Sequence, residues 1–121
     1  MARILLVEDE VVISMATSML LEDEGHVVEI AADGAKGLDM AVASPPDIII
    51  TDYMMPRLDG LTLIVRLRTL GSDVPIILTT SVPESQLPST YPGGHDCYIS
   101  KPYVIGQILD AIETLLSSRL S

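Results

Sequence analysis

Short apolar runs recur five times along the chain, and a longer stretch separates each run from the next. The runs are Ile4–Val7, Val27–Ala31, Asp47–Thr51, Pro75–Thr79 and Cys97–Ser100. The third contains three consecutive isoleucines and leads into Asp52, without the polar alternation of a strand that faces water on one side. It is therefore typical of a strand covered on both faces, as in a parallel sheet between two layers of helices.

Other stretches have the apolar spacing and the end signals of helices. Asp33 and the Asp59-Gly60 pair suit helix N-termini, and Gly25 and Gly71 suit helix ends. The predicted helices cover Val12–Leu21, Ala35–Ala43, Leu61–Leu67 and Ile105–Leu116. Because parallel strands need right-handed helical crossovers, we expect a flavodoxin-like (βα)5 three-layer α/β sandwich with strand order 2-1-3-4-5.

Residues 82–94 depart from this alternation, because they hold three prolines and two glycines where a crossover helix would lie. Pro83 suits a first helical turn, but Pro88 lacks the amide that a helix interior requires and would cost about 3 kcal/mol there. We therefore predict that helix four is shortened or replaced by a proline-rich loop.

Size and composition indicate one domain with an aliphatic core, residues 1–121. A chain of this length buries roughly two-thirds of the surface that it exposes when unfolded, and 48% of its residues are hydrophobic although it has no Trp or Phe. Cys97 is the only cysteine, which excludes an internal disulfide. No segment resembles a signal peptide or the ~20 apolar residues of a membrane span, so we expect a cytoplasmic protein without membrane contact.

The net charge of −10 argues against binding of nucleic acid by this domain and favours divalent cations. Three of the acids, Glu8, Asp9 and Asp52, follow strands one and three, which are neighbours at the switch point of the predicted sheet. Gathered acids repel one another unless a cation neutralises them. We expect Asp9, Asp52 and the backbone carbonyl of Met54 to bind Mg²⁺ directly and Glu8 to bind it through water, with Mn²⁺ as a second candidate.

Two further polar residues, Thr80 and Lys101, are predicted at the ends of strands four and five. A hydroxyl and an ammonium are poor ligands for Mg²⁺ but suit the oxygens of a phosphoryl group on Asp52. An aspartate nucleophile needs the charge on the transferred group to be neutralised, and the cation, Lys101 and Thr80 would supply this. The pattern therefore predicts an aspartyl-phosphate site.

Over essentially its whole length the chain resembles a response-regulator receiver domain of two-component signalling. The matching residues are Glu8-Asp9, Asp52 with Met55-Pro56 and Asp59-Gly60, Thr80, and Tyr98-Ile99-Ser100-Lys101-Pro102. The resemblance implies that Asp52 accepts a phosphoryl group from a phosphohistidine and that Lys101 pairs with it. It also implies that Thr80 and Tyr98 report its presence, and that a cis peptide precedes Pro102.

The switch that this resemblance implies is a change of shape near strands four and five. A new charge on Asp52 would attract the Thr80 hydroxyl and vacate space that the Tyr98 ring can enter from solvent. Met54 and Val82 are apolar and cannot hold an attacking water, so we predict slow loss of the phosphoryl group. Ser81 is the alternative to Thr80 for this hydroxyl role, and it departs from the small apolar residue that similar receivers usually have.

Several other residues are better explained by structure than by chemistry. His26 and His95 do not follow strands beside the acids, and Cys97 suits a small buried position. The methionine pairs and Leu20-Leu21 are interpreted as core residues. Gly34 and Gly37 lack the spacing of a dinucleotide-binding fingerprint, so no other cofactor is predicted.

Three functions remain open at this point. The first is a stand-alone phosphoacceptor switch that ends at Ser121, takes its phosphoryl group from a sensor histidine kinase or a histidine phosphotransfer protein, and signals to a separate downstream protein as a monomer or weak dimer. The second is a Mg²⁺-dependent phosphohydrolase, which usually carries an acid where this chain has Met54. The third is a degenerate receiver, which would be expected to lack an acid, the Thr or the Lys.

Overall fold

Five parallel strands form one sheet in the order β2-β1-β3-β4-β5, as predicted. The computed structural model describes residues 1–120, except for the side chains of residues 119 and 120. The strands are β1 Arg3–Val7, β2 Val27–Ala31, β3 Ile48–Asp52, β4 Ile76–Thr80 and β5 Cys97–Ser100. β3 and β4 are buried along their whole length, which agrees with their continuous apolar sequences and their central place in the sheet.

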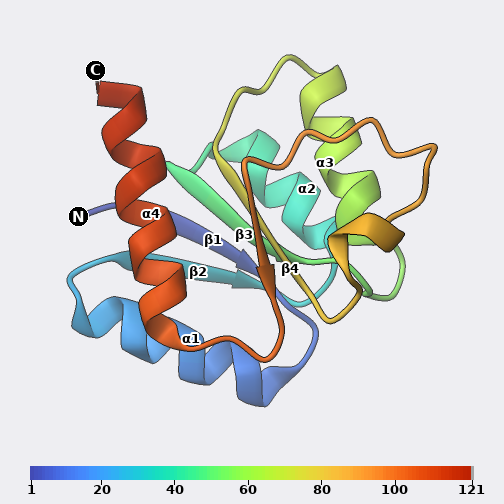
Figure 1. The fold of residues 1–121 in the computed structure, drawn as a ribbon. Coiled ribbons are helices and arrows are strands. Elements are labelled where there is room, and N and C mark those ends of the chain that lie inside the picture. The colour runs from blue at the N-terminus through green and yellow to red at the C-terminus, as the bar shows by residue number, and fades with distance from the viewer. Residues whose placement is uncertain (121) are drawn as a thin grey trace.

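Helices cover both faces of this sheet, so the molecule has three layers (Figure 1). α1 (Val11–Asp23) and α4 (Ile105–Leu120) lie on one face, and α2 (Gly34–Ala43) and α3 (Gly60–Thr69) lie on the other. The predicted caps are present, since Asp33 accepts a hydrogen bond from the Lys36 amide and Asp59 from the Thr62 amide, both at 2.8 Å. The predicted flavodoxin-like α/β sandwich is therefore confirmed.

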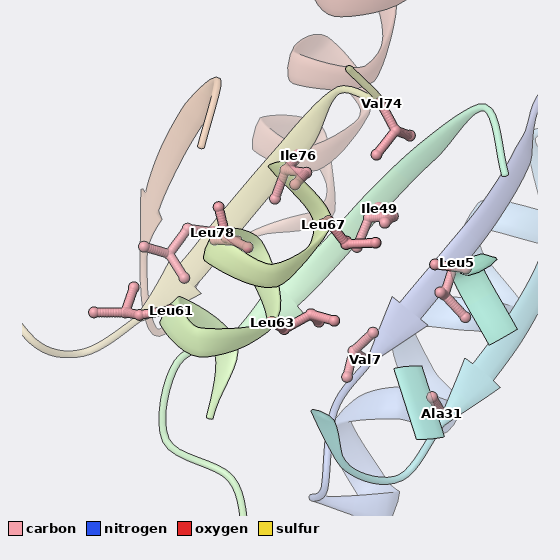
Figure 2. Close-up of a cluster of buried hydrophobic side chains, with 12 residues drawn as sticks. Leu5, Val7, Ala31, Ile49, Leu61, Leu63, Leu67, Val74, Ile76 and Leu78 are labelled. Carbon is pink, nitrogen blue, oxygen red and sulfur yellow. The ribbon is translucent and has the colours of Figure 1, made fainter. Parts of the chain in front are cut away.

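The core consists of two aliphatic clusters, one on each face of the sheet. Figure 2 shows the cluster under α2 and α3, where Leu63 and Leu67 of α3 lie over Ile49 of β3 and Ile76 of β4. All four of these side chains are at most 3% exposed. Burial of such a side chain contributes about 1.5–3 kcal/mol, so this face fixes α3 on the sheet next to the end of β3.

α1 buries mainly polar residues and exposes much of its apolar surface. Its buried residues are Ser14, Thr17, Ser18 and Leu21, whereas Met19 is 62% exposed and Leu20 45% exposed. The interpretation of Leu20 as a core residue was therefore wrong, as it was for Met54, which is 62% exposed. The hydroxyls of Ser14 and Ser18 donate to carbonyls of their own helix, which lowers the cost of burying them.

The crossover between β4 and β5 has no α-helix, which confirms the prediction for the proline-rich segment. A single 3₁₀ turn, η1 (Glu84–Gln86), follows β4, and an irregular chain continues to β5. Pro88 and Pro92 lie in this irregular part, and Gly93 and Gly94 have φ values of 87° and 123° that other residues rarely adopt. None of the helices described is long and apolar enough to span a bilayer.

Candidate functional site

The structure brings the three predicted acids together at the carboxyl edge of the sheet. β1 pairs with β3, and Val7 lies opposite Thr51, so Glu8-Asp9 follows β1 directly beside the end of β3 at Asp52. One carboxylate oxygen from each of Glu8, Asp9 and Asp52 lies within 4.8 Å of the others. Glu8 and Asp52 are buried, 3% and 7% exposed, whereas Asp9 is exposed to solvent. The arrangement is a carboxylate cluster with one open side.

Lys101 reaches this cluster from the turn between β5 and α4. Its Nζ lies 2.7 Å from Glu8 Oε1 and 3.2 Å from Asp52 Oδ2. The turn contains a cis peptide between Lys101 and Pro102, as the resemblance implied. The second oxygen of Asp52 accepts a hydrogen bond from the Tyr53 amide at 2.8 Å. Both oxygens of Asp52 therefore have a positively polarised partner.

Burial and charge act in opposite directions on these groups. Burial raises the pKa of Glu8 and of Asp52, and the nearby Lys101 ammonium partly offsets that rise. For Lys101, burial alone would lower the pKa, but the hydrogen bond to Glu8 and the charge of Asp52 raise it instead. One ammonium faces three carboxylates, so the cluster has an excess of negative charge. Oxygen donors with such an excess are what a hard divalent cation prefers.

Thr80 and Tyr98 meet at the backbone of Val82. Thr80 ends β4, is 2% exposed, and its Oγ1 accepts a hydrogen bond from the Val82 amide at 3.1 Å. The Tyr98 hydroxyl donates to the Val82 carbonyl. Tyr98 is half-buried and packs against the core beneath α3, so in this structure its ring already lies partly inside the protein. A chain of hydrogen bonds thus joins the end of β4 to β5.

A family model for the response regulator receiver domain matches residues 4–113. The chain belongs to this family. The match covers the five strands except Arg3 and the first part of α4, and it includes every site residue described above. Membership agrees with the observed strand order and with the position of the acids at the carboxyl edge of the sheet.

Individual relatives agree with this assignment. The receiver domain is 37% identical over 115 residues to the response regulator MprA of Mycobacterium avium, and 36% identical to MprA of Mycobacterium ulcerans. Each match covers 94% of this chain and 50% of the relative, so the chain spans about half the length of these curated relatives.

Solved structures show the same fold. The receiver domain of the Francisella response regulator 1452 has a TM-score of 0.91 at 25% identity, over 98% of this chain and 99% of that one. A CheY-like receiver domain protein from Methanospirillum hungatei has a TM-score of 0.88 at 30% identity, over 96% and 94% of the two chains. TrrA from Thermotoga maritima, solved in complex with Mg(2+)-BeF, has a TM-score of 0.86 at 28% identity, over 96% and 100%.

Met54 and Ser81 lie near the site but outside the acid cluster. Met54 lies in the turn after β3 with its side chain largely exposed, and its backbone carbonyl stays a predicted ligand. Ser81 is exposed and does not join the acid cluster, but lines a groove next to Lys101. The extra hydroxyl of Ser81 therefore lies on the outer side of the site.

The groove beside the site is a feature that sequence reasoning missed. It has a volume of about 440 Å³ and an apolar wall contributed by α1, including Val12, Ala16 and Leu20. Lys101 and Tyr103 form the other wall. The apolar side chains of α1 could have indicated this groove, but their spacing did not reveal which face of the helix is buried.

Gly60, which follows the predicted cap Asp59 at the start of α3, also contacts the backbone of Asp52. A Cβ atom on Gly60 would lie 1.9 Å from the backbone oxygen of Asp52, and the Gly60 amide donates to the Tyr53 carbonyl at 2.7 Å. The start of α3 therefore contacts the end of β3 without room for any side chain. This close approach fixes the backbone on which the Asp52 carboxylate is mounted.

Proposed function

We propose that this receiver domain accepts a phosphoryl group on Asp52 and passes the resulting change of shape to a partner protein. The observation that carries the proposal is the surroundings of Asp52. Its carboxylate is buried at a strand end, lies 3.2 Å from the Lys101 ammonium, and shares a cluster with Glu8 and Asp9. Pairing of a nucleophilic carboxylate with groups that neutralise a phosphoryl group is the main requirement of this chemistry.

In the proposed transfer, an oxygen of Asp52 forms a bond to phosphorus while the P–N bond of a phosphohistidine donor breaks. The leaving imidazole nitrogen keeps the electron pair of that bond and takes a proton from solvent. The Lys101 ammonium lies beside Asp52 Oδ2 and would stabilise the negative charge on the phosphoryl oxygens. The Tyr53 amide holds the other Asp52 oxygen and orients the carboxylate.

The acid cluster fits a bound Mg²⁺, with Mn²⁺ as the second candidate. Three carboxylates offer oxygen ligands within 4.8 Å of one another, and one of them, Asp9, faces solvent. Mg²⁺ usually takes one or two carboxylates, a carbonyl and several waters, which suits Asp9, Asp52 and the Met54 carbonyl, with Glu8 behind a water. When bound, the ion would neutralise charge on the transferred group. The related TrrA was solved with Mg(2+)-BeF, which supports this assignment.

The proposed signal passes from Asp52 through the Val82 peptide. The Thr80 hydroxyl oxygen accepts from the Val82 amide and keeps its own hydrogen, which it can donate to a phosphoryl oxygen on the neighbouring strand end. The Tyr98 hydroxyl holds the carbonyl of the same residue. Movement of Thr80 toward Asp52 would therefore shift the Val82 peptide and the segment after it.

The proposed donor is a protein that carries a phosphohistidine, either a sensor histidine kinase or a histidine phosphotransfer protein. Such a donor must cover the open side of the site to bring its histidine to Asp52. The groove of about 440 Å³ between α1 and Lys101 borders that side. Its apolar wall, together with the exposed Val12 and Met19 of α1, offers an apolar surface for a helix of the donor. The downstream partner is a second protein, and the domain acts as a monomer or weak dimer.

Intact-mass measurement tests the proposal. With Mg²⁺ and acetyl phosphate we expect a lasting mass gain of one phosphoryl group, which a chelator or Asp52→Asn abolishes. Asp39→Asn is the matched control, because Asp39 is exposed on α2, away from the site. Donor hydrolysis over many turnovers would instead support a phosphohydrolase. Failure of the wild-type protein to gain mass would support a degenerate receiver.

The lifetime of the modified protein is a second measurement. Met54 and Val82 follow Asp52 and Thr80 by two residues, and neither side chain can hold an attacking water. We expect the phosphoryl group to persist far longer than seconds in the purified protein. Complete loss within seconds would contradict this part of the proposal.

A further inference from the structure

A single side-chain hydrogen bond ties the turn that carries Lys101 to α1. The hydroxyl oxygen of Tyr103 lies 2.8 Å from Oγ1 of Thr17, although the two residues are 86 positions apart. Thr17 is buried on α1, and Tyr103 lies two residues after Lys101 and packs against the core beneath α1 and α4. Among residues 1–118, whose side chains the structure describes, no second side-chain hydrogen bond joins α1 to this turn.

Lys101 depends on this turn for its position. Its ammonium lies 2.7 Å from Glu8 Oε1 and 3.2 Å from Asp52 Oδ2. Its backbone belongs to the turn that begins after Ser100, the last residue of β5. Pro102 is exposed and Val104 is 68% exposed, so neither neighbour of Tyr103 anchors the turn by burial. The Lys101 amide donates to the Thr80 carbonyl at 2.9 Å, which holds the start of the turn on the sheet, and the Tyr103 ring and hydroxyl hold the turn against α1.

We propose that Tyr103, through its hydrogen bond to Thr17, is a positioning residue that keeps the Lys101 ammonium in place for phosphoryl transfer to Asp52. The inference rests on the proposed function, since it concerns the same reaction. A phosphoryl group must meet Lys101, Asp52 and the bound cation together, and a displacement of about 1 Å in such a group can lower a rate by up to about 10²-fold. Tyr103 does not touch the reacting atoms.

The test measures the rate of phosphorylation by acetyl phosphate at saturating Mg²⁺. Tyr103→Phe removes only the hydroxyl, and Thr17→Val removes its partner at nearly constant volume. We expect each variant to be phosphorylated about tenfold more slowly than wild type, because loss of one hydrogen bond should displace Lys101 by less than about 1 Å. Tyr91→Phe is the matched control, because it removes a tyrosine hydroxyl whose partner is His95 of the β4–β5 segment rather than α1 or the turn that carries Lys101. Its rate should equal that of wild type.

Two combined variants separate positioning from loss of stability. Tyr103→Phe leaves the buried Thr17 hydroxyl unpaired, and Thr17→Val leaves the hydroxyl of the half-buried Tyr103 without its partner. Thr17→Val with Tyr103→Phe removes both hydroxyls, so the midpoint of urea unfolding should return toward wild type. The phosphorylation rate should stay low, because the turn is still untied. In a Lys101→Met background, Tyr103→Phe should have no further effect, since it acts through Lys101.

The outcomes are distinct. If wild type is phosphorylated and Tyr103→Phe reacts at the same rate, the positioning role is overturned while the proposed function stands. A rate that recovers together with stability in the double variant, or an equal loss in the Lys101→Met background, also overturns it. If wild type itself gains no phosphoryl group, the proposed function fails first.

Discussion

The two crossovers that leave the centre of the sheet are built in different ways. The first runs from β3 to β4 through α3, and its helix satisfies its backbone groups internally. Asp59 caps its first turn, and Leu63, Ile64 and Leu67 bury its inner face. Local sequence signals are sufficient to explain this crossover, because a cap, a glycine and a helical apolar pattern all agree.

The second crossover, from β4 to β5, is held mainly by side chains. Within it only short-range backbone bonds form, such as Gln86 to Pro83 and Tyr91 to Pro88. Arg68, on α3, donates to the Gly94 carbonyl at 2.7 and 3.0 Å and to the Val74 carbonyl at 2.7 Å. Asp96 accepts from Arg68 and from the Ile76 amide.

A second group of side chains ties the start of this crossover to its end. His95 is 2.9 Å from Glu84 through Nε2 and 2.9 Å from the Tyr91 hydroxyl through Nδ1. The rings of Tyr91 and His95 are stacked, with centroids 5.7 Å apart. The loop in place of helix four therefore takes its shape from α3 and from its own side chains. The helix depends far less on the loop.

The largest effect is expected at the start of α3. Gly60→Ala would place a Cβ atom 1.9 Å from the Asp52 backbone oxygen, so the helix or the strand end must move. We expect a loss of about 3 kcal/mol in the free energy of urea unfolding, with slower phosphorylation. Gly106→Ala in α4 meets no atom within 4 Å and is the control. Equal stability of the two variants would show that α3 does not need this close contact.

The next effect tests the dependence of the loop on α3. Arg68→Met removes four hydrogen bonds to the Ser72, Val74 and Gly94 carbonyls and one contact with Asp96. We expect a loss of about 2 kcal/mol and faster amide exchange between residues 92 and 96. Arg66→Met, on an exposed face of the same helix, should change neither. Unchanged amide exchange in Arg68→Met would mean that the loop keeps its shape without Arg68.

The sequence was sufficient for the features that depend on local pattern. Apolar runs located the strands to within about a residue, and alternation with helices gave the strand order. The strand ends placed Glu8, Asp9 and Asp52 at one edge because parallel strands share their carboxyl edge. Prolines and glycines identified the crossover without an α-helix, since Pro88 cannot donate in a helix interior.

Features that depend on distant partners escaped sequence reasoning. A helical period identified α1, but hydroxyls such as Ser14 satisfy themselves within the helix, so polarity did not reveal the buried face. Arg68 is 26 residues away from its loop partner Gly94, and Thr17 is 86 residues away from Tyr103. Neither contact could be predicted from the residues next to Arg68 or next to Thr17.

A smaller effect concerns the cap that the helix has and the loop lacks. Asp59→Ala removes the acceptor for the Thr62 amide and should cost about 1 kcal/mol in urea unfolding. Asp59→Asn keeps a side-chain oxygen at the same position and should stay close to wild type. If both variants lose stability equally, the charge of Asp59 near the helix N-terminus, rather than its hydrogen bond, stabilises α3.

The smallest effect is expected in the loop itself. Pro88→Ala restores an amide, yet Pro92 remains, and Gly93 and Gly94 keep positive φ values that end any helix begun at η1. We expect no gain of helical signal in far-UV circular dichroism and a loss of no more than about 0.5 kcal/mol, from the freer unfolded chain. A clear gain of helix would show that Pro88 alone prevents helix four. In that case the loop would be one substitution away from the architecture of the first crossover, and its side-chain contacts would be a consequence of Pro88 rather than the cause of its shape.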